Sequence, residues 1–277
     1  MQTNLPAVMP ALALRGLTIF PNMMLHFDVG REASIKALDE SMTSGQPIFL
    51  VAQRDLAVEE PKEADLYRVG NISTVRQILR LPGGNVRVMV EGVSRGRLQC
   101  LTQTTPYFTA QVEEIPEETT FRRSARSEAV IRQTYELFEN YIDLAPKMTP
   151  DILLSVLSSE EPGYIADYIA QNLPMRTGDK QAILEELRPV RRLEKLCQNL
   201  RREVAILELE HQMQDKVRDQ LTRSQRDYVL REQLKVIQQE LGEDGQGDSE
   251  LEEYRQRIAQ AKLPQEVADK LTKELGR

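Results

Sequence analysis

The sequence predicts an α+β protein in which a β-rich lobe comes first, followed by a helical lobe and then a very long helix. Three observations predict this order. Short apolar runs between turn residues fill residues 1–116. Apolar residues at helical spacing replace them in residues 117–189. Residues 190–241 contain neither glycine nor proline, so nothing in their composition interrupts a helix.

The first lobe is predicted to be a small barrel or sandwich with one helix. Gly83 and Gly84 separate two runs of alternating apolar residues, which predicts an antiparallel hairpin. From Arg31 onward the apolar residues recur at helical intervals instead, and Gly45 is a suitable stop for that helix. The runs expected to form strands are residues 17–20, 48–52, 70–81, 85–90, 97–101 and 108–115.

Helices are expected throughout the second lobe. One apolar face predicts a helix that closes at Pro146, and it consists of Val130, Ile131, Tyr135, Phe138 and Ile142. Pro150 and Pro162 stand where a first helical turn tolerates proline, so two short helices should begin there. Another helix is expected to start at Thr177.

The uninterrupted stretch 190–241 predicts a coiled-coil-like rod. About 50 residues at a rise of 1.5 Å would give a helix on the order of 75 Å long. Its apolar positions keep a spacing of three and four residues but shift part of the way along, which indicates a stutter in the seam. A flexible acidic linker is expected at 242–249, and residues 250–277 should begin a helical linker.

The composition excludes most catalytic classes. The chain has only two cysteines and two histidines, with no CxxC or HExxH spacing, so no metal site is predicted. No GxxxxGK[ST], GxGxxG or GxSxG motif occurs. A net charge of −7 argues against nucleic acid as a partner, and no apolar run approaches the 18 residues of a membrane span. These features indicate a binding or assembly protein.

Several runs, in this order and covering nearly the whole chain, resemble the N-terminal region of the Lon family of ATP-dependent proteases (endopeptidase La). They are LALRGLTIFPNMMLHFDVGREASIKAL at 12–38, IFLVAQRD at 48–55, DLYRVGNISTVRQILRLPGG at 65–84, VMVEGVSRGRL at 88–98, IADYIAQNL at 165–173, KQAILEEL at 180–187, RLEKLCQNLRREVAILELE at 192–210 and SQRDYVLREQLKVIQQELGE at 224–243.

The resemblance implies that the β-rich lobe is PUA-like and that the chain is the non-catalytic N-terminal portion of such a protease. It implies an AAA+ module and a Ser–Lys protease module after Arg277, with ATP and magnesium bound there. No catalytic residue and no cofactor are expected in this chain, which should have no activity alone. The implied location is the bacterial cytoplasm, and the implied partners are unfolded or degron-bearing proteins and the other subunits of a homo-hexamer.

Two groups of residues are the candidate contacts. An exposed methionine cluster would suit promiscuous capture of unfolded segments, whereas packing in the core of the lobe is the alternative for each residue; the group is Met9, Phe20, Pro21, Met23, Met24 and Leu25. The candidate residues for subunit pairing and coupling to the ATPase ring are Arg31, Glu32, Arg226, Tyr228, Arg231, Glu232, Leu234 and Glu240. For Arg31 and Glu32 the alternative is a solvated helix N-terminus, and for the others it is a solvated face of the long helix.

A second reading of the sequence belongs to another functional class. The same substrate-binding lobe could serve a standalone adaptor or scaffold whose long helix self-associates. A reading frame that continues into a Walker motif would favour the protease, and a genuine stop after codon 277 would favour the adaptor.

Overall fold

A computed structural model describes residues 5–117, 124–145, 150–240, 253–254, 256–258 and 260–261. The chain divides into two units, Met1–Glu208 and Leu209–Arg277. The linker expected at 242–249 and the helix end expected at Pro146 lie outside the described residues.

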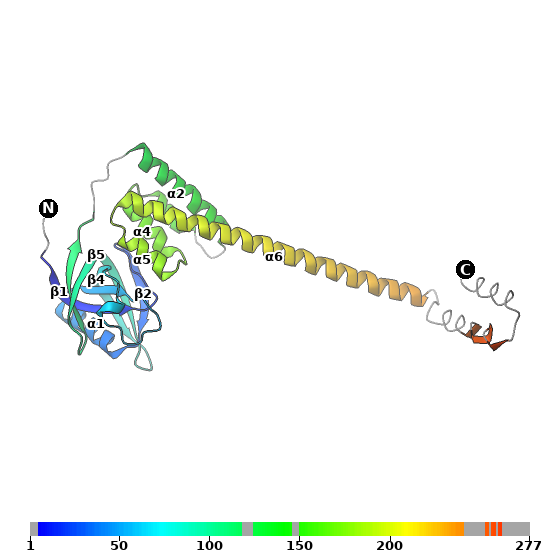
Figure 1. Cartoon of the computed structure of the whole chain (residues 1–277), viewed down its shortest axis with the longest axis horizontal. Coiled ribbons are helices and arrows are strands. Elements are labelled where there is room, and N and C mark those ends of the chain that lie inside the picture. The colour runs from blue at the N-terminus through cyan, green and yellow to red at the C-terminus, as the bar shows by residue number, and fades with distance from the viewer. Residues whose placement is uncertain are drawn as a thin grey trace. The chain divides into compact units, whose positions relative to one another are not determined.

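Six strands form a mixed sheet that closes on itself (Figure 1). The strand order is β2-β5-β4-β3-β1-β6, and β6 pairs with β5 as well as with β1. β1 and β3 are parallel, and the other pairs are antiparallel. The strands are β1 Ala7–Leu14, β2 Met24–Val29, β3 Ile48–Ala52, β4 Val69–Arg80, β5 Val86–Gln103 and β6 Phe108–Ile115.

The predicted hairpin is confirmed between β4 and β5. Gly83 and Gly84 have φ angles of 90° and 85°, a region that glycine adopts without strain, and the Leu81 amide donates to the Asn85 carbonyl at 2.8 Å. The strands expected at 85–90 and 97–101 are two halves of the 18-residue β5.

The strand expected at residues 17–20 is wrong, because these residues form a loop between β1 and β2. Neither β1 nor β2 was among the predicted strands. Ile19 and Phe20 are apolar because they are buried, at 1% and 0% exposed, in two different cores. Pro21 and Asn22, the latter with a φ of 61°, then turn the chain into β2.

Helix α1 (Glu32–Ser44) follows β2 and ends at Gly45, which adopts the left-handed conformation with a φ of 70°. The predicted helix and its stop are therefore confirmed. The side chains of β1 and β3 alternate between two cores, as the pleat of a strand requires. One core combines residues of β1, β2, α1, β3 and β5, namely Leu12, Leu14, Phe27, Val29, Ala37, Leu38, Ile48, Leu50, Val88 and Val90. The other contains Met9, Ala11, Ala13, Phe49, Val51, Ile72, Leu98 and Val112.

The described residues of the first unit that follow β6 form four helices and the start of a fifth. They are α2 (Ala125–Leu144), α3 (Pro150–Leu157), α4 (Pro162–Asn172), α5 (Thr177–Glu185) and the first turns of α6 (Pro189–Glu240). As predicted, α3 and α4 begin at their prolines. Phe20 and Met23, from the loop before β2, lie in the same core as these helices. The β-lobe and the helices therefore share a hydrophobic core.

The predicted long helix is confirmed as α6, which runs for 52 residues. Leu193, Leu196 and Leu200 are fully buried against α2 and α4 residues such as Phe138 and Ile169. From Leu209 to residue 239 every residue of α6 is exposed. At the beginning of α6 the apolar side chains therefore complete a hydrophobic core, whereas from Leu209 onward they are exposed to solvent.

Candidate functional site

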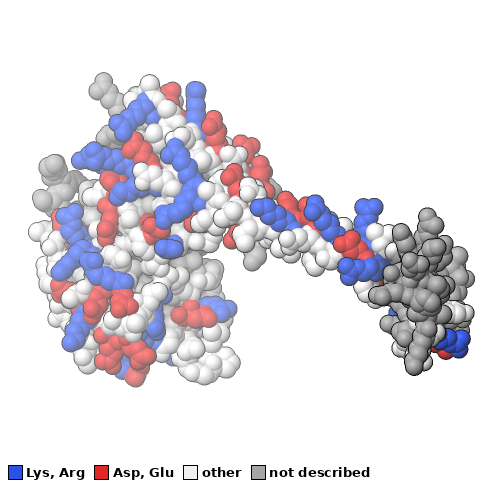
Figure 2. All heavy atoms as spheres, turned by 45° about the vertical axis from the view of Figure 1, so that its right-hand side comes forward, with Lys and Arg blue, Asp and Glu red and all other residues white. Residues whose placement is uncertain are grey.

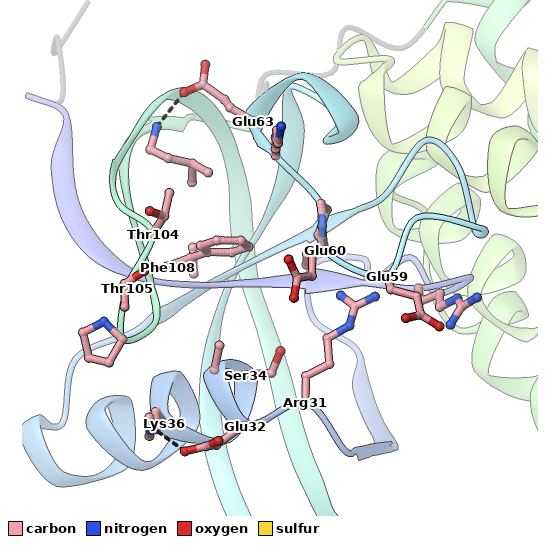
Figure 3. Close-up of a pocket in the computed structure, with 18 residues that line it drawn as sticks. Arg31, Glu32, Ser34, Lys36, Glu59, Glu60, Glu63, Thr104, Thr105 and Phe108 are labelled. Carbon is pink, nitrogen blue, oxygen red and sulfur yellow. Dashed lines mark hydrogen bonds and ion pairs between the residues drawn. The ribbon is translucent and has the colours of Figure 1, made fainter.

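A groove of about 1120 Å³ lies on the β-lobe (Figure 3). Its walls come from β1, the start of α1, the loop at 59–63 and the turn at 104–106 between β5 and β6. Ala11, Ala13, Leu101 and Phe108 provide an apolar lining. Its volume is just above the range of about 300–1,000 Å³ that is typical of small-molecule pockets.

Charged side chains of both signs surround this apolar lining. The basic residues are Arg15, Arg31, Lys36 and Lys62, and the acidic residues are Glu32, Glu59, Glu60 and Glu63. Figure 3 shows the Arg31 side chain extending from the start of α1 toward the segment that carries Glu59 and Glu60. Because the two signs are balanced, the groove combines an apolar surface with separate donors and acceptors.

Arg31 connects α1 to the loop that follows β3. Its Nη2 donates to Gln53 Oε1 at 3.1 Å and to the Val58 carbonyl at 3.5 Å. Partial burial lowers the pKa of Arg31, and the like charge of Arg15 lowers it further, whereas Glu59 opposes the shift. Both of these hydrogen-bond partners are neutral oxygens, so the Arg31 guanidinium can still bind an anionic group in the groove.

The other walls of the groove are held by carboxylates. Glu63 accepts hydrogen bonds from the Leu101 amide at 2.9 Å and from Arg68 at 3.0 Å, so it ties the 59–63 loop to β5. These bonds, the Leu101 amide first, lower the pKa of Glu63. Glu32 forms an ion pair with Lys36 at 2.7 Å within α1, which lowers the pKa of Glu32.

The predicted methionine cluster is not an exposed surface. Met9, Phe20 and Met23 are 6%, 0% and 5% exposed, and Pro21 is also buried. Met9 of β1 packs in a core of the β-lobe, and Phe20 and Met23, from the loop before β2, pack in the core that contains the helices. Met24 is 61% exposed, and Leu25 beside it is half-buried. A substrate contact through this pair stays a prediction.

The residues predicted for subunit or ring coupling lie in two places. Arg31 and Glu32 border the groove. The others are on the exposed half of α6, where Tyr228 and Leu234 are 66% and 57% exposed. Arg226, Arg231 and Glu232 are also exposed, and Glu240 is the last residue of the helix. Figure 2 shows basic and acidic side chains interspersed on α6. The coupling role stays a prediction.

A buried ionic cluster was missed by the sequence analysis. Asp167 of α4 accepts two hydrogen bonds from Arg95 of β5, at 2.7 and 2.9 Å, and one from Arg192 of α6, at 3.0 Å. Arg192 also donates to Glu117 at 3.0 Å. Arg95, Asp167 and Arg192 are each at most 3% exposed. The cluster joins the β-lobe, α4 and the beginning of α6 in one contact.

The members of this cluster also bind backbone carbonyls. Arg95 Nε donates to Leu184 and Arg192 Nε to Glu186, both at 2.9 Å. Burial raises the pKa of Asp167, and the charges of Arg95 and Arg192 oppose that shift. Since Arg95 and Asp167 are 72 residues apart in the chain, no local spacing could have indicated their contact.

Neither a metal centre nor a membrane helix emerges from the described residues. No group of three or more His, Cys, Asp or Glu side chains in this part of the chain could hold a metal ion. Among the same residues, no helix is long and apolar enough to cross a membrane. Cys100 and Cys197 are free thiols.

Comparisons with known proteins agree on one family. A family model described as the ATP-dependent protease La (LON) substrate-binding domain matches residues 8–202. Proteins named Lon protease from Syntrophomonas wolfei and Clostridioides difficile are each 41% identical, over 97% and 99% of this chain. A third, from Desulforamulus reducens, is 43% identical over 97% of it. The chain spans about a third of the length of these relatives.

Two solved structures share the fold. The N-terminal domain of the Mycobacterium avium complex Lon protease aligns with a TM-score of 0.56 at 19% identity, covering 70% of this chain and 98% of that domain. The Lon N-terminal domain protein from Xanthomonas campestris aligns with a TM-score of 0.50 at 14% identity, covering 69% of this chain and 96% of that protein. A β-rich lobe followed by helices is thus common to all three.

Proposed function

Because the chain belongs to the ATP-dependent protease La (LON) substrate-binding domain family, we propose that it captures unfolded or degron-bearing polypeptides for an ATP-dependent serine protease. The observation that carries this proposal is that the matched residues 8–202 contain the groove between β1, α1 and the β5–β6 turn. Its apolar lining and its balanced charges suit an extended segment of variable sequence.

Assembly and delivery are the second part of the proposal. The exposed half of α6 carries apolar side chains that single-chain packing leaves in solvent, such as Leu209, Met213, Val217 and Leu221. We propose that this half supports a homo-hexamer and passes captured segments to an ATPase ring, where ATP and magnesium bind. The named relatives are bacterial, which supports a bacterial cytoplasmic setting.

Fluorescence anisotropy tests the capture step directly. A labelled, permanently unfolded protein is titrated with this chain, and its folded form is titrated in parallel. We expect micromolar binding of the unfolded form only. Absence of binding up to about 100 μM would contradict capture by this chain alone. Capture would then require the avidity of several linked weak sites.

A matched pair of variants tests the groove. Thr104→Trp places a bulky side chain at an exposed position that lines the groove, and it should weaken binding about tenfold by filling the space. Thr43→Trp introduces the same side chain at an exposed position in the last turn of α1, outside the groove, and it should leave binding unchanged. Equal affinities for both variants would show that the groove is not the contact.

A further inference from the structure

Among the residues that the structure describes, strand β2 has a neighbouring strand on one side only. It pairs with β5 in an uninterrupted antiparallel register from Met24↔Glu91 to Val29↔Val86. It stands at the end of the strand order, whereas β6 at the other end also pairs with β5. The outer edge of such a strand presents every second N–H and C=O without a partner strand.

The usual protections of an edge strand are missing from β2. Natural edge strands often carry lysine, proline or a bulge that prevents another strand from pairing. β2 reads MLHFDV, which contains neither lysine nor proline, and its register has no shift. Its one charged residue, Asp28, is engaged by Arg87 of β5 at 2.7 and 2.9 Å. The edge is therefore chemically able to accept another strand.

The two faces of β2 differ in polarity. Phe27 and Val29 are buried in the core that contains Val88 and Val90 of β5, and Leu25 packs against it. Met24, His26 and Asp28 are exposed on the opposite face. A depression of about 370 Å³ is lined by three residues of β2, His26, Phe27 and Asp28, and by Arg87 of the paired strand β5. A strand added at the outer edge of β2 would place every second side chain beside Leu25 and Phe27.

We propose that β2 binds an extended segment of an unfolded polypeptide by strand addition, with apolar side chains preferred at alternate positions of that segment. This inference rests on the proposed function. A site that accepts many sequences must recognise what they share, and main-chain N–H and C=O groups are common to all of them. The occupant is an unfolded chain because a folded protein has few unpaired main-chain groups to offer.

The test uses a labelled peptide of alternating valine and threonine with lysine at both ends. The control peptide has the same side chains but is N-methylated at every valine and threonine, which removes the donors. We expect the control to bind the 277-residue chain at least about tenfold more weakly. Hydrogen exchange should slow at alternate β2 amides when the unmethylated peptide binds. Equal binding of the two peptides, or unchanged β2 exchange, would overturn strand addition.

A variant pair completes the test. Met24→Lys combined with His26→Lys adds the charges that protect natural edges, and it should weaken peptide binding at least about fivefold. Leu79→Lys, at a position of β4 that is 52% exposed, should not change it. If the unfolded protein of the previous experiment still binds while peptide methylation has no effect, strand addition fails and the proposed function stands. Protection of β2 by dimerisation without peptide would instead make this edge a self-interface and overturn the proposal.

Discussion

At the residue scale, Asp167 is the carboxylate on which three elements meet. Arg95 from β5 and Arg192 from α6 both donate to it, and all three side chains are buried. Bringing such charges out of water costs much of what their attraction contributes, so the net stabilisation by the intact cluster is small. Its effect is specificity, because it favours the arrangement of the β-lobe, α4 and α6 in which Asp167 binds both guanidinium groups.

Asp167→Asn should destabilise the chain by about 3–5 kcal/mol, because two buried guanidinium groups would lose their buried counter-charge and be left with Glu117, whose side chain is 38% exposed. Urea unfolding followed by circular dichroism measures this change. Arg126→Gln removes one partner of an ion pair with Glu194 in which Arg126 is 77% exposed, and it should cost at most about 0.5 kcal/mol. If the two variants unfold at the same urea concentration, the cluster does not hold the elements together.

At the element scale, two glycines differ in the space around them: a side chain at one would collide with backbone, whereas the other has room for a methyl group. A Cβ on Gly92 of β5 would lie 2.2 Å from the Phe20 carbonyl oxygen, so the loop before β2 approaches β5 more closely than any other residue would allow. Gly92 also exchanges backbone hydrogen bonds of 2.8 Å with Asn22 and Met23. Gly178 in α5 has no atom within 4 Å of the equivalent position.

Gly92→Ala should therefore destabilise the chain by about 1–3 kcal/mol, since backbone must move to admit the methyl group. Gly178→Ala should be neutral or stabilise it by up to about 1 kcal/mol, because alanine restricts the unfolded chain and favours a helix. Thermal unfolding of the two variants beside the parent chain measures both effects. A Gly92→Ala protein that unfolds at the same temperature as the parent chain would contradict the close approach of the loop.

At the scale of the whole molecule, α6 belongs to both units. Its first turns complete the hydrophobic core of Met1–Glu208, and its described residues from Leu209 onward are exposed. A helix of this length with unpartnered apolar side chains is stabilised mainly when another surface covers them. The buried beginning of α6 and the cluster around Asp167 thus anchor a helix whose described residues from Leu209 onward are exposed.

Replacing Tyr228 and Leu234 by alanine should uncouple protein degradation from ATP hydrolysis in a longer protein that carries the ATPase and protease modules. We expect protein degradation to fall several-fold while basal ATP hydrolysis is retained, because both side chains are more than half exposed on α6 and their loss removes contact area rather than core packing. Parallel assays of casein degradation and ATP hydrolysis measure the ratio. An unchanged ratio would exclude a coupling role for this part of α6.

Local rules of the chain already determine much of this protein. Glycine at positions 45, 83 and 84 predicts a helix stop and a hairpin, because these conformations depend on the residue itself. The glycine- and proline-free stretch predicts α6, since only local hydrogen bonds are required. The order of the quoted runs was also sufficient to indicate the family.

Contacts between distant segments were decided by the tertiary structure alone. Met23 and Met24 are adjacent in sequence, yet they are 5% and 61% exposed, because only one of them points into the helical core. The groove is assembled from four separate segments, and the Arg95–Asp167–Arg192 cluster from three. The open edge of β2 likewise depends on which strands pair. Such features follow from packing between elements, which local propensity and spacing do not encode.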